Sequence, residues 1–118
     1  MNRLHRWLCT SDGWCSTLQQ RVPWVIADTD LRPNVLEIGS GRGLTTDLLR
    51  TSVSRLTAIE IDPKLAAALS SRVAKSNVRV IEADATHMPF GNSEFSSAVS
   101  FTMLHHVPCL ELQDQLLR

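Results

Sequence analysis

Glycine occupies three alternate positions, 39, 41 and 43, between the apolar run 35–38 and a segment typical of a helix. Glycine adopts backbone angles that a side chain obstructs, and it allows a ligand to lie against bare backbone. A tight turn without any ligand is the alternative explanation for such a cluster. The strand before the glycines and the helix after them favour instead a ligand-binding turn of an α/β domain.

From residue 35 onward, short apolar runs alternate with segments of helical periodicity. Strands separated by helical segments of about a dozen residues form right-handed βαβ units with a parallel sheet. The turns that follow such strands gather at the carboxyl edge of the sheet, where ligands bind. We predict four strands, over 35–38, 56–61, 78–83 and 95–101, and helices over 45–50, 64–75 and from about residue 105 or 108.

The first 33 residues differ from the rest because they contain no strand-like run. Their apolar spacing predicts a helix over 11–29, either kinked or divided at Pro23, since proline interrupts helical hydrogen bonding. We therefore divide the chain into an N-terminal helical extension, 1–33, and an α/β domain, 34–118. All three tryptophans fall in the extension; we expect Trp14 and Trp24 to pack in the core, whereas the place of Trp7 stays open.

Charge and composition exclude several classes of protein. The 118 residues carry 12 basic and 12 acidic side chains, and a net charge of zero argues against a dedicated polyanion binder. No run approaches the roughly 20 apolar residues that span a bilayer, and no signal peptide is evident, so we expect a soluble, cytoplasmic chain. The cysteines at 9, 15 and 109 form no Cys-x-x-Cys pair, which argues against a structural zinc site.

Two carboxylates narrow the choice of ligand for the glycine turn. Glu60 follows Gly39 by about 20 residues, at the end of the next strand, where a carboxylate can accept hydrogen bonds from both hydroxyls of a ribose. A dinucleotide fingerprint would place its last glycine at Leu44, and Glu37 would repel a pyrophosphate at the helix N-terminus. Glu37 suits a cationic amino group better. S-adenosylmethionine fits both carboxylates, and an NAD-dependent oxidoreductase is disfavoured.

The stretch 35–108, about two thirds of the chain, resembles the class I S-adenosylmethionine-dependent methyltransferases. The similar motifs are VLEIGSGRG (35–43), AIEIDP (58–63), VIEADATHMPF (80–90) and SFTMLHHVP (100–108), in the family's order. The resemblance implies a Rossmann-like three-layer sandwich with a mostly parallel sheet. It also implies S-adenosyl-L-methionine as the cofactor.

The resemblance further implies which residues bind that cofactor. Those assigned to the methionine end are Glu37 for the amino group, the loop residues Gly39, Ser40, Gly41 and Gly43, and the backbone of Ser100 and Phe101. Those assigned to the nucleoside are Glu60 for the ribose hydroxyls, Ile61 for the adenine face, and Asp84 with the Ala85 amide for the adenine edge. No catalytic residue is assigned, because a sulfonium is already an activated methyl donor.

Two subtypes of the family compete for the acceptor. VLEIGSGRG and AIEIDP look much like the ribosomal RNA adenine dimethylases, which carry Asn-(Leu/Ile)-Pro-(Tyr/Phe) after the fourth strand to grip a flipped base. This chain has Ser-Phe-Thr-Met over 100–103 instead. The segments MPF and LHHVP are more similar to small-molecule and lipid methyltransferases of the ubiquinone-biosynthesis type. We expect a small-molecule acceptor and no nucleic-acid partner.

Two adjacent histidines, His105 and His106, invite the role of a general base because imidazole titrates near neutral pH. We favour the interpretation that they cap a helix or line the pocket without transferring protons. Neighbouring helical positions point apart, which disfavours a metal site at this pair.

The family's sheet has seven strands, of which only four can be counted here. We therefore expect the chain to be truncated after the fourth strand, which would leave that strand as an open edge. A homo-oligomer or a partner chain could cover such an edge. A non-catalytic S-adenosylmethionine-binding fragment or interaction module is the alternative to an active enzyme.

Overall fold

The computed structural model describes residues 4, 7, 11–31 and 33–118. They fall into two compact units, one ending at Asp30 and the other running from Leu31 to Arg118. Of the three cysteines, Cys15 and Cys109 are free thiols, whereas Cys9 lies outside the described residues. Within the described part of the chain, no helix is long and apolar enough to cross a membrane.

In the first unit, helix α2 (Asp12–Ala27) continues through Pro23. Its N-cap is Ser11, whose hydroxyl oxygen accepts a hydrogen bond from the Trp14 amide at 3.2 Å. Trp14 is half-buried, but the prediction for Trp24 is wrong, because 78% of that residue is exposed. The buried side of α2 contains Leu18 and Val22. Trp24 comes two positions after Val22 and therefore lies on the opposite side of the helix.

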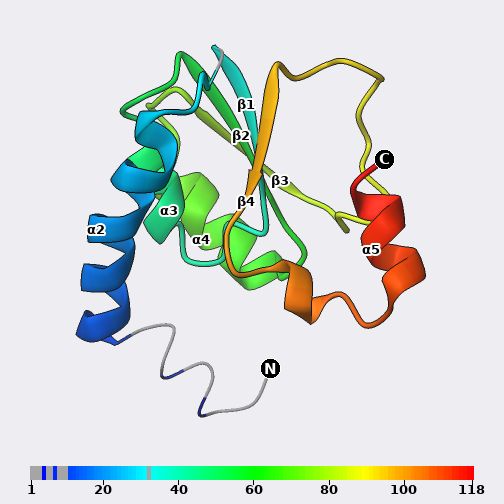
Figure 1. Ribbon diagram of the computed structural model, residues 1–118, viewed down its shortest axis with the longest axis horizontal. Coiled ribbons are helices and arrows are strands. Elements are labelled where there is room, and N and C mark those ends of the chain that lie inside the picture. Colours follow the sequence, from blue (N-terminus) through cyan, green and yellow to red (C-terminus); the bar gives the residue numbers. More distant parts are fainter. Residues whose placement is uncertain (1–3, 5–6, 8–10, 32) are drawn as a thin grey trace. The chain divides into compact units, whose positions relative to one another are not determined.

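The second unit is built on a four-stranded parallel sheet, which confirms the predicted α/β fold (Figure 1). Its strands are β1 (Asn34–Ile38), β2 (Arg55–Glu60), β3 (Val78–Glu82) and β4 (Ser97–Ser100). The order is β3-β2-β1-β4, and every neighbouring pair is parallel. The direction of the strand order therefore reverses between β1 and β4, which is where such sheets open a crevice for ligands.

Helices connect and cover the strands at bounds that differ by a few residues from the predicted ones. They are α3 (Leu44–Leu49), α4 (Pro63–Val73), the 3-10 turn η1 (Leu104–His106) and α5 (Leu110–Leu116). Helix α4 begins cleanly because the Asp62 carboxylate accepts hydrogen bonds from the amides of Lys64 and Leu65, and Pro63 occupies its first turn.

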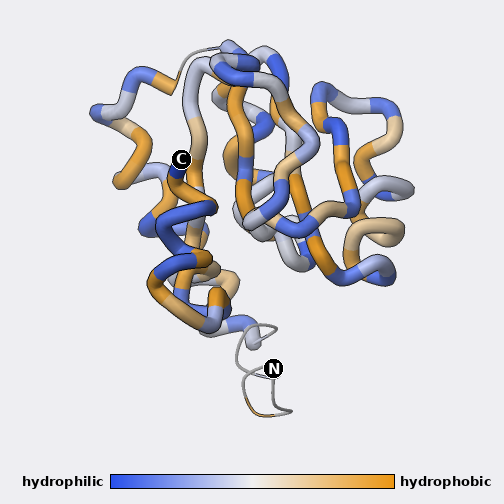
Figure 2. Tube along the Cα trace, turned by 90° about the vertical axis from the view of Figure 1, so that its right-hand side faces the viewer, coloured by the Kyte–Doolittle hydropathy of each residue, from blue (hydrophilic) through white to orange (hydrophobic). Residues whose placement is uncertain are grey.

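Apolar side chains pack on both faces of the sheet, giving three layers. One cluster lies between the sheet and α5 and contains the buried residues Leu36, Ile38, Ile59, Val107 and Leu116. The other lies under α4 and contains Ala58, Leu69 and Val73. Successive residues of a strand face opposite sides, so Ala58 and Ile59 belong to different layers. Hydrophobic stretches of the chain alternate with hydrophilic turns (Figure 2).

The core under α4 generates a stability prediction. Leu69 is buried against the sheet, so replacing it with alanine leaves a cavity and lowers the free energy of unfolding by about 2–5 kcal/mol. Ser70→Ala, on the exposed side of the same helix, changes it by less than about 0.5 kcal/mol. Urea denaturation followed by circular dichroism measures both. Equal midpoints for the two variants would contradict the packing described.

Candidate functional site

A glycine loop connects β1 to α3 at the carboxyl edge of the sheet. All three glycines have positive φ, +76° at Gly39, +54° at Gly41 and +82° at Gly43, which side chains rarely adopt. The amides of Gly39 and Ser40 both donate to the Ile59 carbonyl, at 3.0 and 3.1 Å. The loop is thus anchored on the last residues of β2.

The three glycines have different surroundings on the side where a Cβ would stand. At Gly39 the side chain of Met103 fills that space, and at Gly43 the side chains of Leu69 and Arg72 fill it. At Gly41, leaving aside its two chain neighbours, no atom of the described residues lies within 4 Å of the Cβ position. Gly41 is therefore the glycine of this loop whose bare face is open to a ligand.

Glu60 joins the end of β2 to the glycine loop. One oxygen of its carboxylate, Oε2, accepts a hydrogen bond from the Gly41 amide at 2.7 Å. The other, Oε1, accepts one from the Asp62 amide at 3.0 Å. The residue is buried, so its carboxylate is held in one orientation beside the open glycine.

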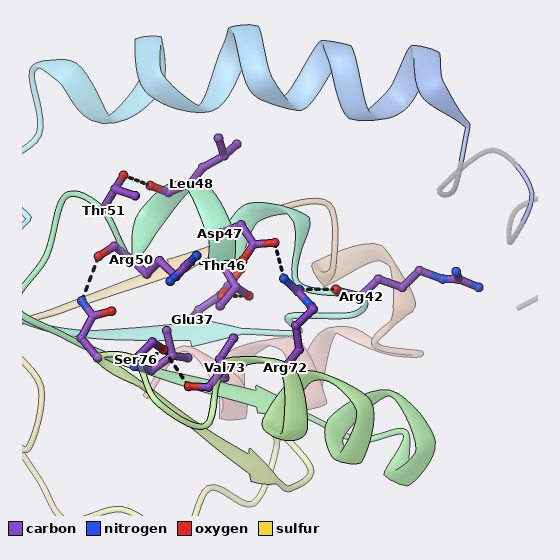
Figure 3. Close-up of polar contacts among 12 residues, drawn as sticks. Glu37, Arg42, Thr46, Asp47, Leu48, Arg50, Thr51, Arg72, Val73 and Ser76 are labelled. Atoms are coloured by element: carbon purple, nitrogen blue, oxygen red, sulfur yellow. Dashed lines mark hydrogen bonds and ion pairs between the residues drawn. The ribbon is translucent and has the colours of Figure 1, made fainter.

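Glu37 lies beneath the loop and is only 1% exposed. One oxygen of its carboxylate accepts a hydrogen bond from the Thr45 hydroxyl. The other accepts one from the Thr46 hydroxyl at 2.6 Å (Figure 3). Burial raises the pKa of Glu37 above its ordinary value of 4.5, although these two hydrogen bonds oppose the rise. Neither threonine was predicted as a site residue, although their position in the first turn of the helix after Glu37 was the available signal.

The turn after β3 brings Asp84 and Ala85 to the same edge. The Ala83 amide donates to the Glu60 carbonyl at 3.0 Å, so this turn begins beside the end of β2. Asp84 Oδ1 accepts from the amide and the hydroxyl of Thr86, each at 2.8 Å. These bonds lower the pKa of Asp84, and its side chain stays exposed.

The remaining predicted site residues border the same edge. Ile61 follows Glu60 and has an exposed side chain. Ser100 pairs with Ile38 at the end of β1, and the half-buried Phe101 follows it. Ser40 is buried, and its hydroxyl has no hydrogen-bond partner within the part of the chain that the structure describes.

The segment after β4 reaches back over the glycine loop. Thr102 has a positive φ of +53°, an unusual conformation for a β-branched residue, and the next side chain, Met103, packs on Gly39. Sequence reasoning missed this contact, because nothing in the pattern of residues 100–108 indicates where Met103 points. His105 and His106 are exposed, with ring centroids 4.0 Å apart.

Taken together, these turns bring carboxylate acceptors and open backbone to one edge of the sheet. Glu60 offers a fixed acceptor beside Gly41, and the sheet brings the Asp84 turn and the end of β4 to the same edge. Among the described residues, no group of three or more His, Cys, Asp or Glu side chains is placed to hold a metal ion.

Known proteins resemble this chain in sequence and in fold. A sequence profile described as a methyltransferase domain matches residues 36–118. The probable ribosomal RNA small subunit methyltransferase A of Thermococcus onnurineus (strain NA1) is 42% identical over 74 residues, which are 63% of this chain and 26% of that protein. The ribosomal RNA small subunit methyltransferase A of Rubrobacter xylanophilus is 43% identical over 68 residues, 57% of this chain and 26% of that protein.

A solved structure provides the comparison of folds. The N-methyltransferase NodS from Bradyrhizobium japonicum WM9, in complex with S-adenosyl-L-homocysteine, superposes with a TM-score of 0.74 at 20% identity. The superposition covers 93% of this chain and 56% of that one. At this identity the likeness shows the fold alone. The chain spans about a quarter of the length of the two curated relatives named above.

The buried Glu37 generates a prediction for the pH dependence of stability. Because its pKa is raised in the folded state, the folded protein holds this proton over a pH range that begins near 4.5, where the unfolded chain has lost it. The contribution of Glu37 to stability therefore falls as pH rises through that range, with a slope no steeper than about 1.4 kcal/mol per pH unit.

Glu37→Gln cannot titrate, so the unfolding free energy of the wild type minus that of the variant should fall with rising pH above 4.5. The lowered pKa of Asp84 affects both proteins equally and cancels in this difference. Urea denaturation across pH 4 to 8, in about one-unit steps, measures it. A difference that is flat, or that rises with pH, would contradict the burial of an ionisable carboxyl at this position.

Proposed function

This chain belongs to the methyltransferase-domain family, and on that premise we propose that it binds S-adenosyl-L-methionine at the glycine loop as the methyl donor of a methyltransferase. One observation carries the proposal. Gly41 leaves open the space beside its α-carbon, while its amide donates to the carboxylate of Glu60. A ligand seated against Gly41 would therefore lie next to a fixed acidic acceptor.

Glu60 is suited to the ribose of this cofactor. Each of its carboxylate oxygens accepts one backbone hydrogen bond, and an ionised carboxylate offers about four acceptor positions in all. One further position on each oxygen is left for the two vicinal hydroxyls. The adenine would lie along Ile61 and the Asp84 turn, and the Ala85 amide would face the ring. Asp84 Oδ2 accepts no hydrogen bond from Thr86 and lies 3.9 Å from His87 Nδ1.

The methionine end would lie on the β4 side of the loop. Ser40 offers there a buried hydroxyl that has no hydrogen-bond partner among the described residues, and the backbone of Ser100 and Phe101 borders the same position. Glu37 is only 1% exposed beneath the loop, and its oxygens accept the hydroxyls of Thr45 and Thr46, so we assign Glu37 an indirect action on the amino group. It holds the first turn of α3 in place, and its acidic group lies under the part of the loop that would receive a cation.

Methyl transfer requires that the acceptor be aligned with the methyl group of the sulfonium and that water be excluded. The residues on this chain bind and orient the donor, and the proposal assigns none of them as a general base. For the acceptor we propose a small molecule or a lipid-like compound. The net charge of zero and the segment Ser-Phe-Thr-Met over 100–103, in place of a base-gripping Asn-Leu-Pro-Tyr type of motif, support this choice.

A ribosomal RNA adenine is the second candidate acceptor. It is favoured by the names of the two curated relatives, which are 42% and 43% identical to this chain over the matched residues. A third hypothesis is that the chain is a non-catalytic module that binds S-adenosylmethionine. Residues that bind the cofactor do not distinguish these three, because they contact the donor alone.

Radiolabel transfer separates the candidates. With tritiated S-adenosylmethionine, the small-molecule proposal predicts label in a deproteinised extract of metabolites and lipids and none in an unmodified small-subunit ribosomal RNA transcript. Label in the RNA would overturn this choice in favour of the second candidate. Label in neither, from a protein that binds the cofactor, would favour the binding module.

Gly41→Ala tests the cofactor site. The added methyl group would occupy the ligand's place, so the Kd for S-adenosylhomocysteine measured by calorimetry should rise at least tenfold, about 1.4 kcal/mol. Gly91→Ala is the control, because Gly91 also has room for a methyl group and lies in a different turn. An unchanged Kd in a folded Gly41→Ala protein would refute the assignment.

Strain needs a separate check, since alanine at a left-handed φ costs about 1–2 kcal/mol. If Gly41→Ala fails to fold, Gly41→Asn replaces it, because asparagine tolerates this conformation and still fills the space. The expected result for that variant is the same loss of affinity.

A further inference from the structure

Arg72, near the end of α4, contacts two separate parts of the glycine-loop region. Its Nη1 lies 2.6 Å from Asp47 Oδ2 on α3, and its Nη2 donates to the Arg42 carbonyl oxygen at 3.0 Å (Figure 3). One guanidinium therefore links a loop carbonyl, the first helix after the loop and the helix after β2. A planar fork with several donors is the side chain that can make such a pair of bonds at once.

The backbone of the loop rests directly on α4 at the next residue. A Cβ added at Gly43 would collide with Leu69 and Arg72, so at this position the two side chains pack against bare backbone. The Gly43 carbonyl in turn accepts from the Asp47 amide at 3.0 Å. Arg72 therefore binds the carbonyl of Arg42, directly before Gly43, and the carboxylate of Asp47, four residues after it.

The contact is too exposed to act chiefly as a stabilising ion pair. The Arg72 and Asp47 side chains are 46% and 35% exposed, and exposed pairs of this kind contribute little to folding stability. The hydrogen bond to the Arg42 carbonyl nevertheless restrains the loop. Glycine has wide conformational freedom, and three of the loop's residues are glycines. A loop that is ordered before the ligand arrives avoids the entropic cost of ordering on binding.

We propose that Arg72 is a positioning residue that holds the glycine loop in its ligand-accepting conformation and so sets the affinity for the cofactor. The inference rests on the proposed function for the identity of that cofactor. It does not require Arg72 to touch the ligand. A plain structural ion pair between α3 and α4 is the competing explanation.

The test compares three variants with a matched control. Arg72→Gln removes both contacts, and Arg72→Lys keeps a charge for Asp47 without the fork that also reaches the Arg42 carbonyl. Asp47→Asn weakens the contact to α3 and leaves the contact to the loop. Arg79→Gln removes the same charge from an exposed residue of β3 and is the control.

Calorimetric titration with S-adenosylhomocysteine is the first measurement. We expect the Kd to rise about five- to tenfold in Arg72→Gln, less in Arg72→Lys and Asp47→Asn, and not at all in Arg79→Gln. A structural role alone predicts a different result. It lowers the fraction of folded protein, and hence the apparent stoichiometry, and it leaves the Kd of the folded molecules unchanged.

Amide spectra of the ligand-free proteins are the second measurement, and they do not depend on the identity of the ligand. The ¹H–¹⁵N signals of Gly39, Gly41 and Gly43 should shift or broaden in Arg72→Gln and stay in place in Arg79→Gln. If the wild type binds and Arg72→Gln binds equally well, the inference is overturned while the proposed function stands. If the wild type does not bind, the proposed function fails, and unchanged glycine signals would then overturn the positioning role as well.

Discussion

The hydrogen bond from the Gly41 amide to the Glu60 carboxylate is the contact on which the site depends. It joins the turn after β1 to the turn after β2. These two turns begin at the same level of the sheet because the register pairs Ile38 with Ile59. The amides of Gly39 and Ser40 reinforce the junction by donating to the Ile59 carbonyl. An acidic acceptor and an open stretch of backbone are thereby brought together by contacts within the protein.

Contacts from α3, α4 and the segment after β4 support this junction. Glu37 and the two threonines of α3 fix the start of the helix under the loop. From the side, Leu69 and Arg72 of α4 pack against Gly43, and Met103 packs against Gly39. Two of the three glycines are therefore required by close packing within the protein. No described residue packs in this way against the third, Gly41, so the structural reason for a glycine there is its positive φ.

Local patterns predicted much of this arrangement. The periodicity of apolar residues located all four strands, and the parallel topology followed from the helices between them. The meeting of the glycine loop with Glu60 was predictable too, because the ends of adjacent parallel strands share one edge. Side-chain directions over longer distances were not predictable. The threonine partners of Glu37 depend on how α3 turns over β1, Met103 depends on the path of an irregular segment, and Trp24 shows that a tryptophan at roughly helical spacing need not be buried.

The most direct test of the central claim is an amide-resolved titration of the unmodified chain with S-adenosylhomocysteine, followed by ¹H–¹⁵N spectra, with NADH titrated in parallel. The account predicts saturable shifts at Gly41 and at the residues after β2 and β3, and weaker binding of NADH. A folded protein whose spectrum does not respond to S-adenosylhomocysteine, or one that binds NADH more tightly at the same residues, would contradict it.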